Sequence, residues 1–355
     1  MFQNFITSHN GKFFDGKDEF RFIGCNMYEL ANVENVLSQK MLASAKDQGF
    51  EVVRFWVFDK TARNNFKNIC DIASELGLRL IPVLADNWGY LMNEKINDEW
   101  YLSGYKKNYL KNVIDLLSEF SDRKEILLWE MINEPASSNF DSVFNFTKDV
   151  SAEFKKNNSN HLLSVGTIGG IGDKFGNEFS RFNNSNFEKL YSLTDLDAVS
   201  IHDYSFNSSL AERLDIYQRF KGKYTSSAIL NNLDKIINFI PGLIDKFTLR
   251  KFNDVYDIPL TLRSIWQTYI SKNIQTAAKY KKPLYIGEIG FKKVMGLNRK
   301  KVIEKEFIKY LNSGVSGILL WSFESEGRSK DGHDYGFDER DGFKEVIEKI
   351  KSEYY

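Results

Sequence analysis

Two glutamates stand where apolar stretches of the sequence end, and together they could carry acid–base and covalent chemistry. Glu134 follows an apolar run that begins at Ile126, and Pro135 directly after it stops further strand pairing. Glu288 ends a second run of the same pattern, which begins at Pro283. Hydrolysis of an acetal needs one protonated carboxyl to donate to the leaving oxygen and one ionised carboxylate to attack the anomeric carbon. Two carboxylates close together also push their pKa values apart, which would provide one of each.

The ends of other apolar runs add side chains that suit the same chemistry. An arginine beside a carboxylate keeps it ionised, a tyrosine hydroxyl can hold its oxygen in line, and an asparagine can bind a sugar hydroxyl. Indole rings suit the C–H faces of pyranose rings. The candidates at these ends are Arg54, Trp56, Asp86, Asn87, Trp88, Asn133, His202, Asp203, Tyr204 and Trp321. Arg54 could instead balance a buried acid, for which Glu130 is the candidate.

Eight short apolar segments supply these ends, and most are separated by a segment of helical periodicity. The predicted strands are residues 21–26, 51–58, 78–84, 126–132, 161–167, 197–203, 284–289 and 316–323. The predicted helices are residues 34–48, 62–76, 103–121, 141–156, 265–280, 299–312 and 341–352. Continuous apolar runs are typical of parallel strands buried on both faces, so the order favours an α/β fold, a (β/α)8 TIM barrel. No Gly-x-Gly-x-x-Gly follows the first strand, which argues against a Rossmann fold.

Two segments depart from the plain repeat. Aromatic-rich pieces around Asn10-Gly11 predict a hairpin that floors the barrel. Residues 205–264 form a long helical insertion after the sixth strand, and a loop of this length on the catalytic face is expected to act as a lid or side wall. The alternative is a solvated decoration far from the site. No linker or change of composition divides the chain, so residues 1–355 are expected to form a single domain.

Charge and cysteine content limit the partners. The 48 basic and 48 acidic residues cancel, which argues against nucleic acid or an anionic membrane and favours a neutral substrate. Cys25 and Cys70 are expected to be buried free thiols, with a disulfide between them as the alternative. The amino terminus does not resemble a signal peptide and no apolar stretch is long enough to span a membrane, so a cytoplasmic protein is expected, with a trimmed secreted form as the alternative. The chain is also expected to be a monomer and to need no cofactor.

Several of these motifs resemble those of glycoside hydrolase family 5, which belongs to a clan of retaining (β/α)8 glycosidases. They are Val-Val-Arg54-Phe-Trp, Trp-Glu-Met-Ile-Asn133-Glu134-Pro, His202-Asp-Tyr204, Tyr-Ile-Gly-Glu288 and Leu-Leu-Trp321. The resemblance implies that Glu134 is the acid/base and Glu288 the nucleophile. It also implies that Arg54, Asn133, His202, Tyr204 and Trp321 surround the sugar in subsite −1. The opening segment, Gly-Lys-Phe-Phe-Asp-Gly at residues 11–16, and Asp-Asn-Trp88 look most like the endo-β-1,4-mannanases. This resemblance implies a mannan, glucomannan or derived oligosaccharide as substrate.

Other functions remain open at this point. Within the family, a β-1,4-glucanase or an exo-acting β-glycosidase is the alternative, and a lid at 205–264 would favour exo action. Outside it, the barrel could be a carbohydrate-binding pseudoenzyme, which the presence of both Glu134 and Glu288 opposes. Asp331, His333 and Asp334 could hold a metal, although such a loop is more often a solvated turn, and no metal is expected. Activity that persists in EDTA would exclude a metal hydrolase. Retention predicts carboxyl groups about 5–5.5 Å apart, against about 6.5–9.5 Å for inversion.

Overall fold

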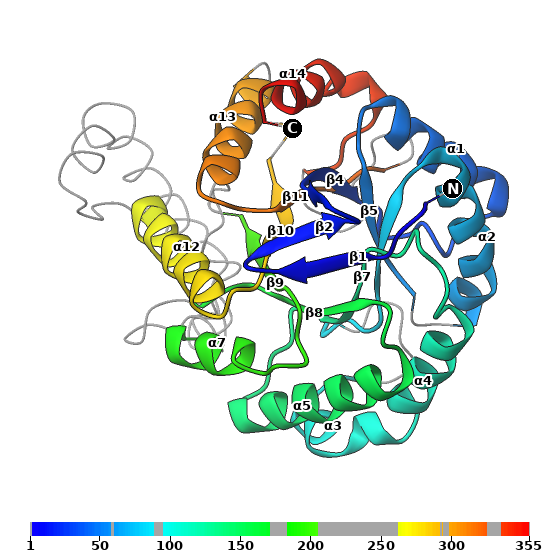
Figure 1. The fold of residues 1–355 in the computed structure, drawn as a ribbon, viewed down its shortest axis with the longest axis vertical. Coiled ribbons are helices and arrows are strands. Elements are labelled where there is room, and N and C mark those ends of the chain that lie inside the picture. The colour runs from blue at the N-terminus through cyan, green and yellow to red at the C-terminus, as the bar shows by residue number, and fades with distance from the viewer. Residues whose placement is uncertain are drawn as a thin grey trace, which may run out of the picture.

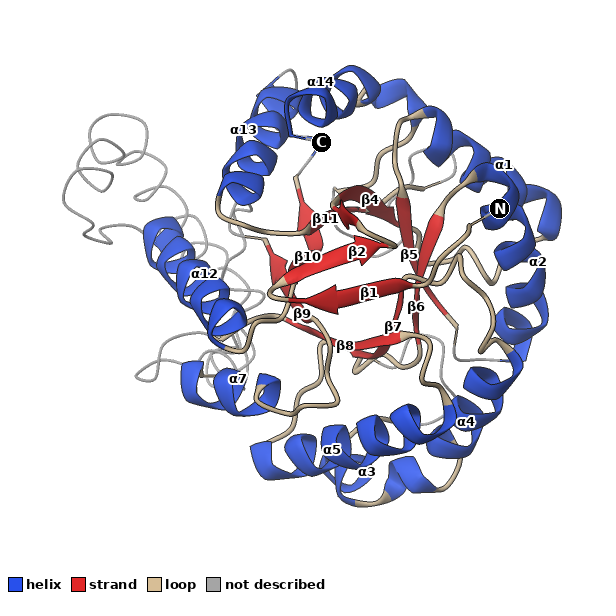
Figure 2. Ribbon diagram, in the orientation of Figure 1, coloured by secondary structure: helices blue, strands red, loops and turns tan. Residues whose placement is uncertain are grey.

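The chain folds into a closed barrel of parallel strands surrounded by helices (Figures 1 and 2). The computed structural model describes residues 2–57, 60–88, 95–170, 183–204, 262–291, 293, 298–324 and 335–354. The barrel order is β10-β11-β4-β5-β6-β7-β8-β9. Its strands are β4 (Phe22–Asn26), β5 (Val52–Trp56), β6 (Arg79–Val83), β7 (Leu128–Asn133), β8 (Leu162–Thr167), β9 (Val199–Asp203), β10 (Leu284–Gly290) and β11 (Gly317–Trp321). The predicted TIM barrel and all eight predicted strands are confirmed.

Burial on both faces explains why these strands read as unbroken apolar runs. Every residue of the eight barrel strands is buried. Outward-facing residues such as Val53 and Ile286 pack against the helices, and inward-facing ones such as Val52 and Tyr285 fill the lower barrel. A central strand with apolar residues on both faces loses the alternation that marks a half-exposed sheet.

An amino-terminal antiparallel sheet closes one end of the barrel, as the Asn10-Gly11 motif predicts. It consists of β1 (Ile6–His9), β2 (Lys12–Asp15) and β3 (Asp18–Phe20), in that order. Ile6 and Phe13 join the inner core formed by the first residues of the barrel strands. Figure 1 shows β1 and β2 lying across the barrel opening. This floor leaves the carboxyl ends of the strands as the end where a site can form.

The helices form the outer ring. They are α1 (Asn35–Asp47), α2 (Lys60–Leu76), α3 (Asp98–Leu102), α4 (Tyr109–Glu119), α5 (Phe140–Asn157), α7 (Asn184–Tyr191), α12 (Leu262–Lys279), α13 (Asn298–Asn312) and α14 (Lys344–Tyr354). The single helix predicted over 103–121 is wrong at its start. Ser103 leaves helical geometry there, and a short 3₁₀ turn, Gly104–Lys106, separates α3 from α4. Helix α7 was not predicted; the Asn183 side chain caps it by accepting from the backbone N–H of Asn186.

The predicted insertion falls almost entirely outside the described residues; its last three positions, 262–264, belong to α12. The loop with Asp331, His333 and Asp334 also lies outside them. Cys25 and Cys70 are both buried and free, so the expected thiols are confirmed. Among the helices that the structure describes, none has the length and apolarity to cross a membrane.

Candidate active site

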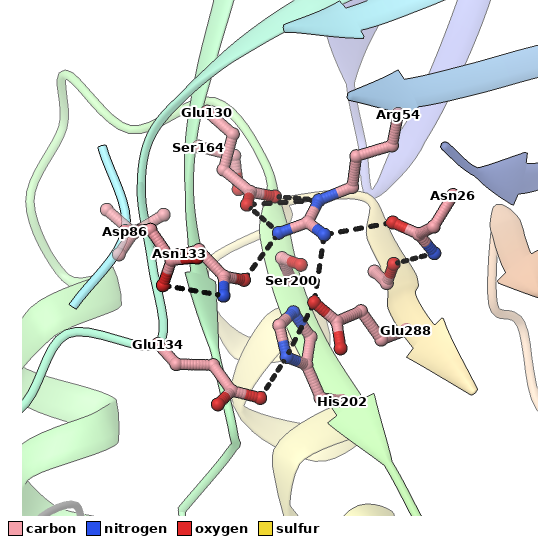
Figure 3. A network of polar contacts seen from close by, with 12 residues as sticks. Asn26, Arg54, Asp86, Glu130, Asn133, Glu134, Ser164, Ser200, His202 and Glu288 are labelled. Carbon is pink, nitrogen blue, oxygen red and sulfur yellow. Dashed lines mark hydrogen bonds and ion pairs between the residues drawn. The ribbon is translucent and has the colours of Figure 1, made fainter. Parts of the chain in front are cut away.

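Glu134 and Glu288 meet at the carboxyl end of the barrel, as the strand pattern predicts. Glu134 directly follows β7 and Glu288 lies near the end of β10, and both side chains are buried (Figure 3). Carboxylate oxygens of the two residues lie within 4.8 Å of one another, and His202 shares this cluster. Glu134 has a φ of 45°, a left-handed conformation that costs a residue with a side chain about 1–2 kcal/mol. The surrounding barrel therefore holds the Glu134 backbone in a left-handed conformation that is unfavourable for a glutamate.

An extra residue in each of the two strands directs the acids inward. Along β7 the register against β8 shifts between Glu130 and Asn133, and along β10 the register against β9 shifts between Ile286 and Glu288. Side chains on a regular strand alternate between faces, so residues three apart would point to opposite sides. The irregularity lets Glu130 and Asn133 both point into the barrel. Such bulges commonly re-aim side chains beside active sites.

Arg54 on β5 links the two acid-bearing strands. Its guanidinium donates to Oε1 of Glu288 at 3.0 Å and to Oδ1 of Asn133 at 2.7 Å, and it forms an ion pair with Glu130. Burial alone would lower the pKa of Arg54, but the charges of Glu130 and Glu288 outweigh it and raise that pKa. Both roles considered for Arg54 are therefore present at once, because it balances Glu130 and also bonds Glu288.

Three further donors approach the two acids. The Tyr204 hydroxyl donates to Oε2 of Glu288 at 2.6 Å, and the Trp88 indole N–H donates to Oε2 of Glu134 at 2.8 Å. Nδ1 of His202 lies 2.7 Å from Oε1 of Glu134 and 3.7 Å from Oε1 of Glu288. Oε1 of Glu134 offers lone pairs whether the carboxyl is ionised or carries its proton on Oε2, so we assign a proton to Nδ1 of His202. Glu288 is thus held by a cation and a hydroxyl, and Glu134 by two ring N–H groups.

Asp86 places a third buried carboxyl at the rim, next to Asn133. Its Oδ1 accepts from the backbone N–H of Trp88 at 3.1 Å and from Nδ2 of Asn133 at 3.3 Å. Burial raises the pKa of Asp86 to about 7; these two hydrogen bonds oppose the rise, and the charges of Glu134 and Glu288 add to it. The Asn133 amide is therefore held from both sides, by Asp86 and by Arg54.

The tryptophans near the site differ in their surroundings. Trp321 and Trp56 pack edge to face at 5.6 Å between ring centres, in an aromatic cluster that also contains Tyr204. Trp88 is 49% exposed beside Glu134, as a stacking platform requires. Trp100 is buried in the hydrophobic core beneath the helices. The side chain of Trp266 lies outside the described residues.

Three site residues were not singled out from the sequence. Asn26 ends β4, accepts from Arg54 at 2.9 Å and donates to the carbonyl of Gly287 at 3.0 Å. The Tyr285 hydroxyl donates to Glu130 at 2.8 Å. A Cβ at Gly166 would lie 2.2 Å from the Glu130 carboxylate, so glycine makes room for the ion pair. Position at a strand end could have indicated Asn26, whereas nothing in the local sequence marks Tyr285 or Gly166.

Glu134, His202 and Glu288 form the one group among the described residues with three donors close enough to share a metal ion. Their arrangement does not favour a cation. Arg54 already lies 3.0 Å from Glu288, and Nδ1 of His202 faces Glu134. A metal would have to compete with this positive charge and displace these contacts.

Comparison with known proteins decides the family. A model of the cellulase family, glycosyl hydrolase family 5, matches residues 15–327. The chain belongs to glycosyl hydrolase family 5. It is 25% identical over 264 residues to the Aspergillus terreus protein named "Probable mannan endo-1,4-beta-mannosidase C", covering 57% of this chain and 64% of that protein. It is 27% identical over 268 residues to mannan endo-1,4-β-mannosidase 2 of Oryza sativa subsp. japonica, covering 59% and 60%. The matched stretch thus spans about three fifths of each relative.

Solved structures share the fold over nearly the whole chain. An endo-1,4-β-mannanase from Rhizomucor miehei aligns with a TM-score of 0.68 at 16% identity, covering 97% of both chains. Cel5A of Thermotoga maritima, in complex with a mannotriose substrate, aligns with a TM-score of 0.56 at 16% identity, covering 92% of this chain and 96% of that one. At these identities the likeness establishes the barrel fold.

Proposed function

We propose that this family 5 member is a retaining β-glycoside hydrolase that acts on β-1,4-linked mannan, glucomannan or their oligosaccharides. The observation that carries the proposal is the pair of buried strand-end glutamates, Glu134 and Glu288, with oxygens within 4.8 Å and different hydrogen-bond partners. This separation supports the spacing of about 5–5.5 Å used for double displacement over the spacing of about 6.5–9.5 Å that inversion uses.

The partners of each acid divide the roles between them. Arg54 and Tyr204 stabilise negative charge on Glu288 and orient one oxygen each, which suits a nucleophile. Glu134 receives ring N–H groups, from His202 and Trp88, in place of a guanidinium. Each carboxyl oxygen has two lone pairs, so Oε2 of Glu134 can accept from Trp88 and still carry a transferable proton.

The reaction then follows in two displacements. Glu288 attacks the anomeric carbon while Glu134 protonates the departing oxygen, which gives a glycosyl ester on Glu288 and a free leaving sugar. Glu134, now ionised, removes a proton from water, the water attacks the same carbon, and the ester bond to Glu288 breaks with net retention. Asn133 is fixed by Arg54 and Asp86 in a position to bind a sugar hydroxyl, and the exposed ring of Trp88 can stack on a pyranose face.

The mannanase names of the two sequence relatives favour a mannan-type substrate. The family model carries the name cellulase, so β-1,4-glucan is the second candidate. Product analysis on mannan, glucomannan, cellulose and their pentasaccharides separates the two. A rapid fall in polymer viscosity indicates endo action, whereas release of short sugars from chain ends alone indicates exo action.

The mechanism is tested by the two acids separately. Glu288→Ala should abolish turnover, and azide should restore it as an α-glycosyl azide. Glu134→Ala should slow substrates with poor leaving groups far more than activated aryl glycosides. Glu125→Ala is the matched control, because Glu125 is also buried but precedes β7 at the opposite end of the barrel; it should keep its activity. A first-formed product of inverted anomeric configuration, measured by NMR, would refute the retaining mechanism.

A further inference from the structure

Asp86 is a buried carboxyl in the site that neither displacement uses. Its backbone extends β6 along the rim beside β7, because Asp86 bridges Asn133 in parallel and the N–H of Asn87 donates to the carbonyl of Asn133 at 3.1 Å. Its side chain is 1% exposed. Figure 3 shows it against Asn133, on the side away from Arg54. The backbone therefore fixes this carboxyl within the site.

Two hydrogen-bond chains lead from Asp86 to the two acids. One passes from its Oδ1 to the Asn133 amide, on to Arg54 and from there to Glu288. The other passes through the backbone of Trp88, whose indole reaches Glu134. Asp86 touches neither acid in these contacts. Any effect on the reaction has to act through Asn133, through Trp88 or through its charge.

We propose that Asp86 is a positioning residue that holds the Asn133 amide and the Trp88 backbone in place, and that its negative charge keeps the proton on Glu134 at higher pH. The inference rests on the proposed function. It adds a third carboxyl to the two of the double displacement, with a role in setting the pH range of activity.

The charges around Asp86 determine the direction of the effect. Among the described residues, the charges that act on Asp86 are those of Glu134 and of Glu288 on β10. One contact further on lie Arg54, which donates to Asn133, and His202, which contacts Glu134. Glu134 and Glu288 both oppose ionisation of Asp86, and its burial raises its pKa to about 7. Repulsion is reciprocal, so ionised Asp86 makes loss of the Glu134 proton less favourable.

Two substitutions separate the charge from the hydrogen bonds. The amide oxygen in Asp86→Asn can still accept from Trp88 and Asn133, but the charge is lost; Asp86→Ala loses both. Asp197→Asn is the matched control. Asp197 precedes β9 at the far end of the barrel, where its partners are Lys155 and the backbone of Leu163, and burial raises its pKa as well.

The test measures kcat and kcat/KM against pH for the wild type and these three variants, on mannopentaose and cellopentaose. Asp86→Asn should keep kcat at its optimum within a few-fold, and its alkaline limb should move to lower pH by about 1 unit, the order expected when one nearby charge is removed at an effective dielectric of about 20. Asp86→Ala should show the same shift and lose at least about tenfold more kcat, as expected when two hydrogen bonds are lost. Asp197→Asn should leave the limb in place.

An alkaline limb that stays in place in Asp86→Asn overturns the inference, as does an Asp86→Ala enzyme with the kcat of Asp86→Asn. If Asp86→Ala does not fold, the shift in Asp86→Asn decides. Absence of hydrolysis by the wild type on every substrate would instead overturn the proposed function together with this inference. If the wild type hydrolyses a substrate and the alkaline limb of Asp86→Asn stays in place, only this inference is overturned.

Discussion

Replacement of Arg54 by methionine tests whether one buried cation supports both the fold and the site. Arg54 is fully buried, and its ion-pair partner Glu130 is fully buried too. Removal of one partner of a buried pair typically destabilises a protein by about 3–5 kcal/mol, because the other charge stays buried without compensation. Unfolding entropy of about 2.1 cal/mol/K per residue over 355 residues converts this loss into a fall in Tm of about 4–7 °C.

The assay is thermal and urea unfolding of Arg54→Met at pH 7. Arg54→Met/Glu130→Gln should recover part of the stability at pH 7, since it removes both charges of the pair. Arg63→Met, which breaks a surface pair with Glu119 at 3.4 Å, should cost less than about 1 kcal/mol. A loss in Arg54→Met as small as that of Arg63→Met would refute the reasoning.

Two further outcomes follow from contacts in the site. Tyr204→Phe removes the hydroxyl that donates to Glu288 at 2.6 Å, so kcat should fall by roughly 10- to 100-fold with the fold intact by circular dichroism; an unchanged kcat would show that this hydrogen bond does not act in the reaction. The carboxyl of Asp86 has its pKa raised from 3.8 to about 7, so the folded state keeps a proton that the unfolded state releases, and stability falls as pH rises between about 4 and 7. Asp86→Asn does not undergo this loss, so it should be more stable than the wild type at pH 8 by at most about 4 kcal/mol, and no more stable at pH 4. Equal unfolding midpoints of the two proteins at pH 8 would contradict the raised pKa.

The sequence predicted the barrel because its strands are apolar on both faces, and it predicted the main site residues because they end those strands. Arg54, Glu134, His202, Tyr204 and Glu288 do lie together. Helix α7 was missed because its amphipathic pattern spans only Asn184–Tyr191, too short to be distinguished from a loop.

What sequence periodicity cannot predict is where a strand departs from it. Asn133 lies three positions after Glu130, which on a regular strand would place it on the outer face, yet both bond Arg54 inside the barrel. The irregular register along β7 brings this about, and it depends on pairing with β8 rather than on the residues of β7 alone. Gly166, on that neighbouring strand, is required because any side chain there would clash with Glu130.

These departures gather at one rim of the barrel, and each opposes stability. Glu134 has a left-handed backbone, β7 and β10 carry irregular registers, and Asp86 is buried as an acid with a raised pKa. Such local costs persist only where surrounding structure enforces them, and they concentrate where function needs a fixed geometry. The enforcing structure here is the paired backbone of β6, β7 and β8 together with the Arg54 ion pairs. The same strands that make the fold recognisable from sequence therefore also hold the acids in positions that the sequence alone does not predict.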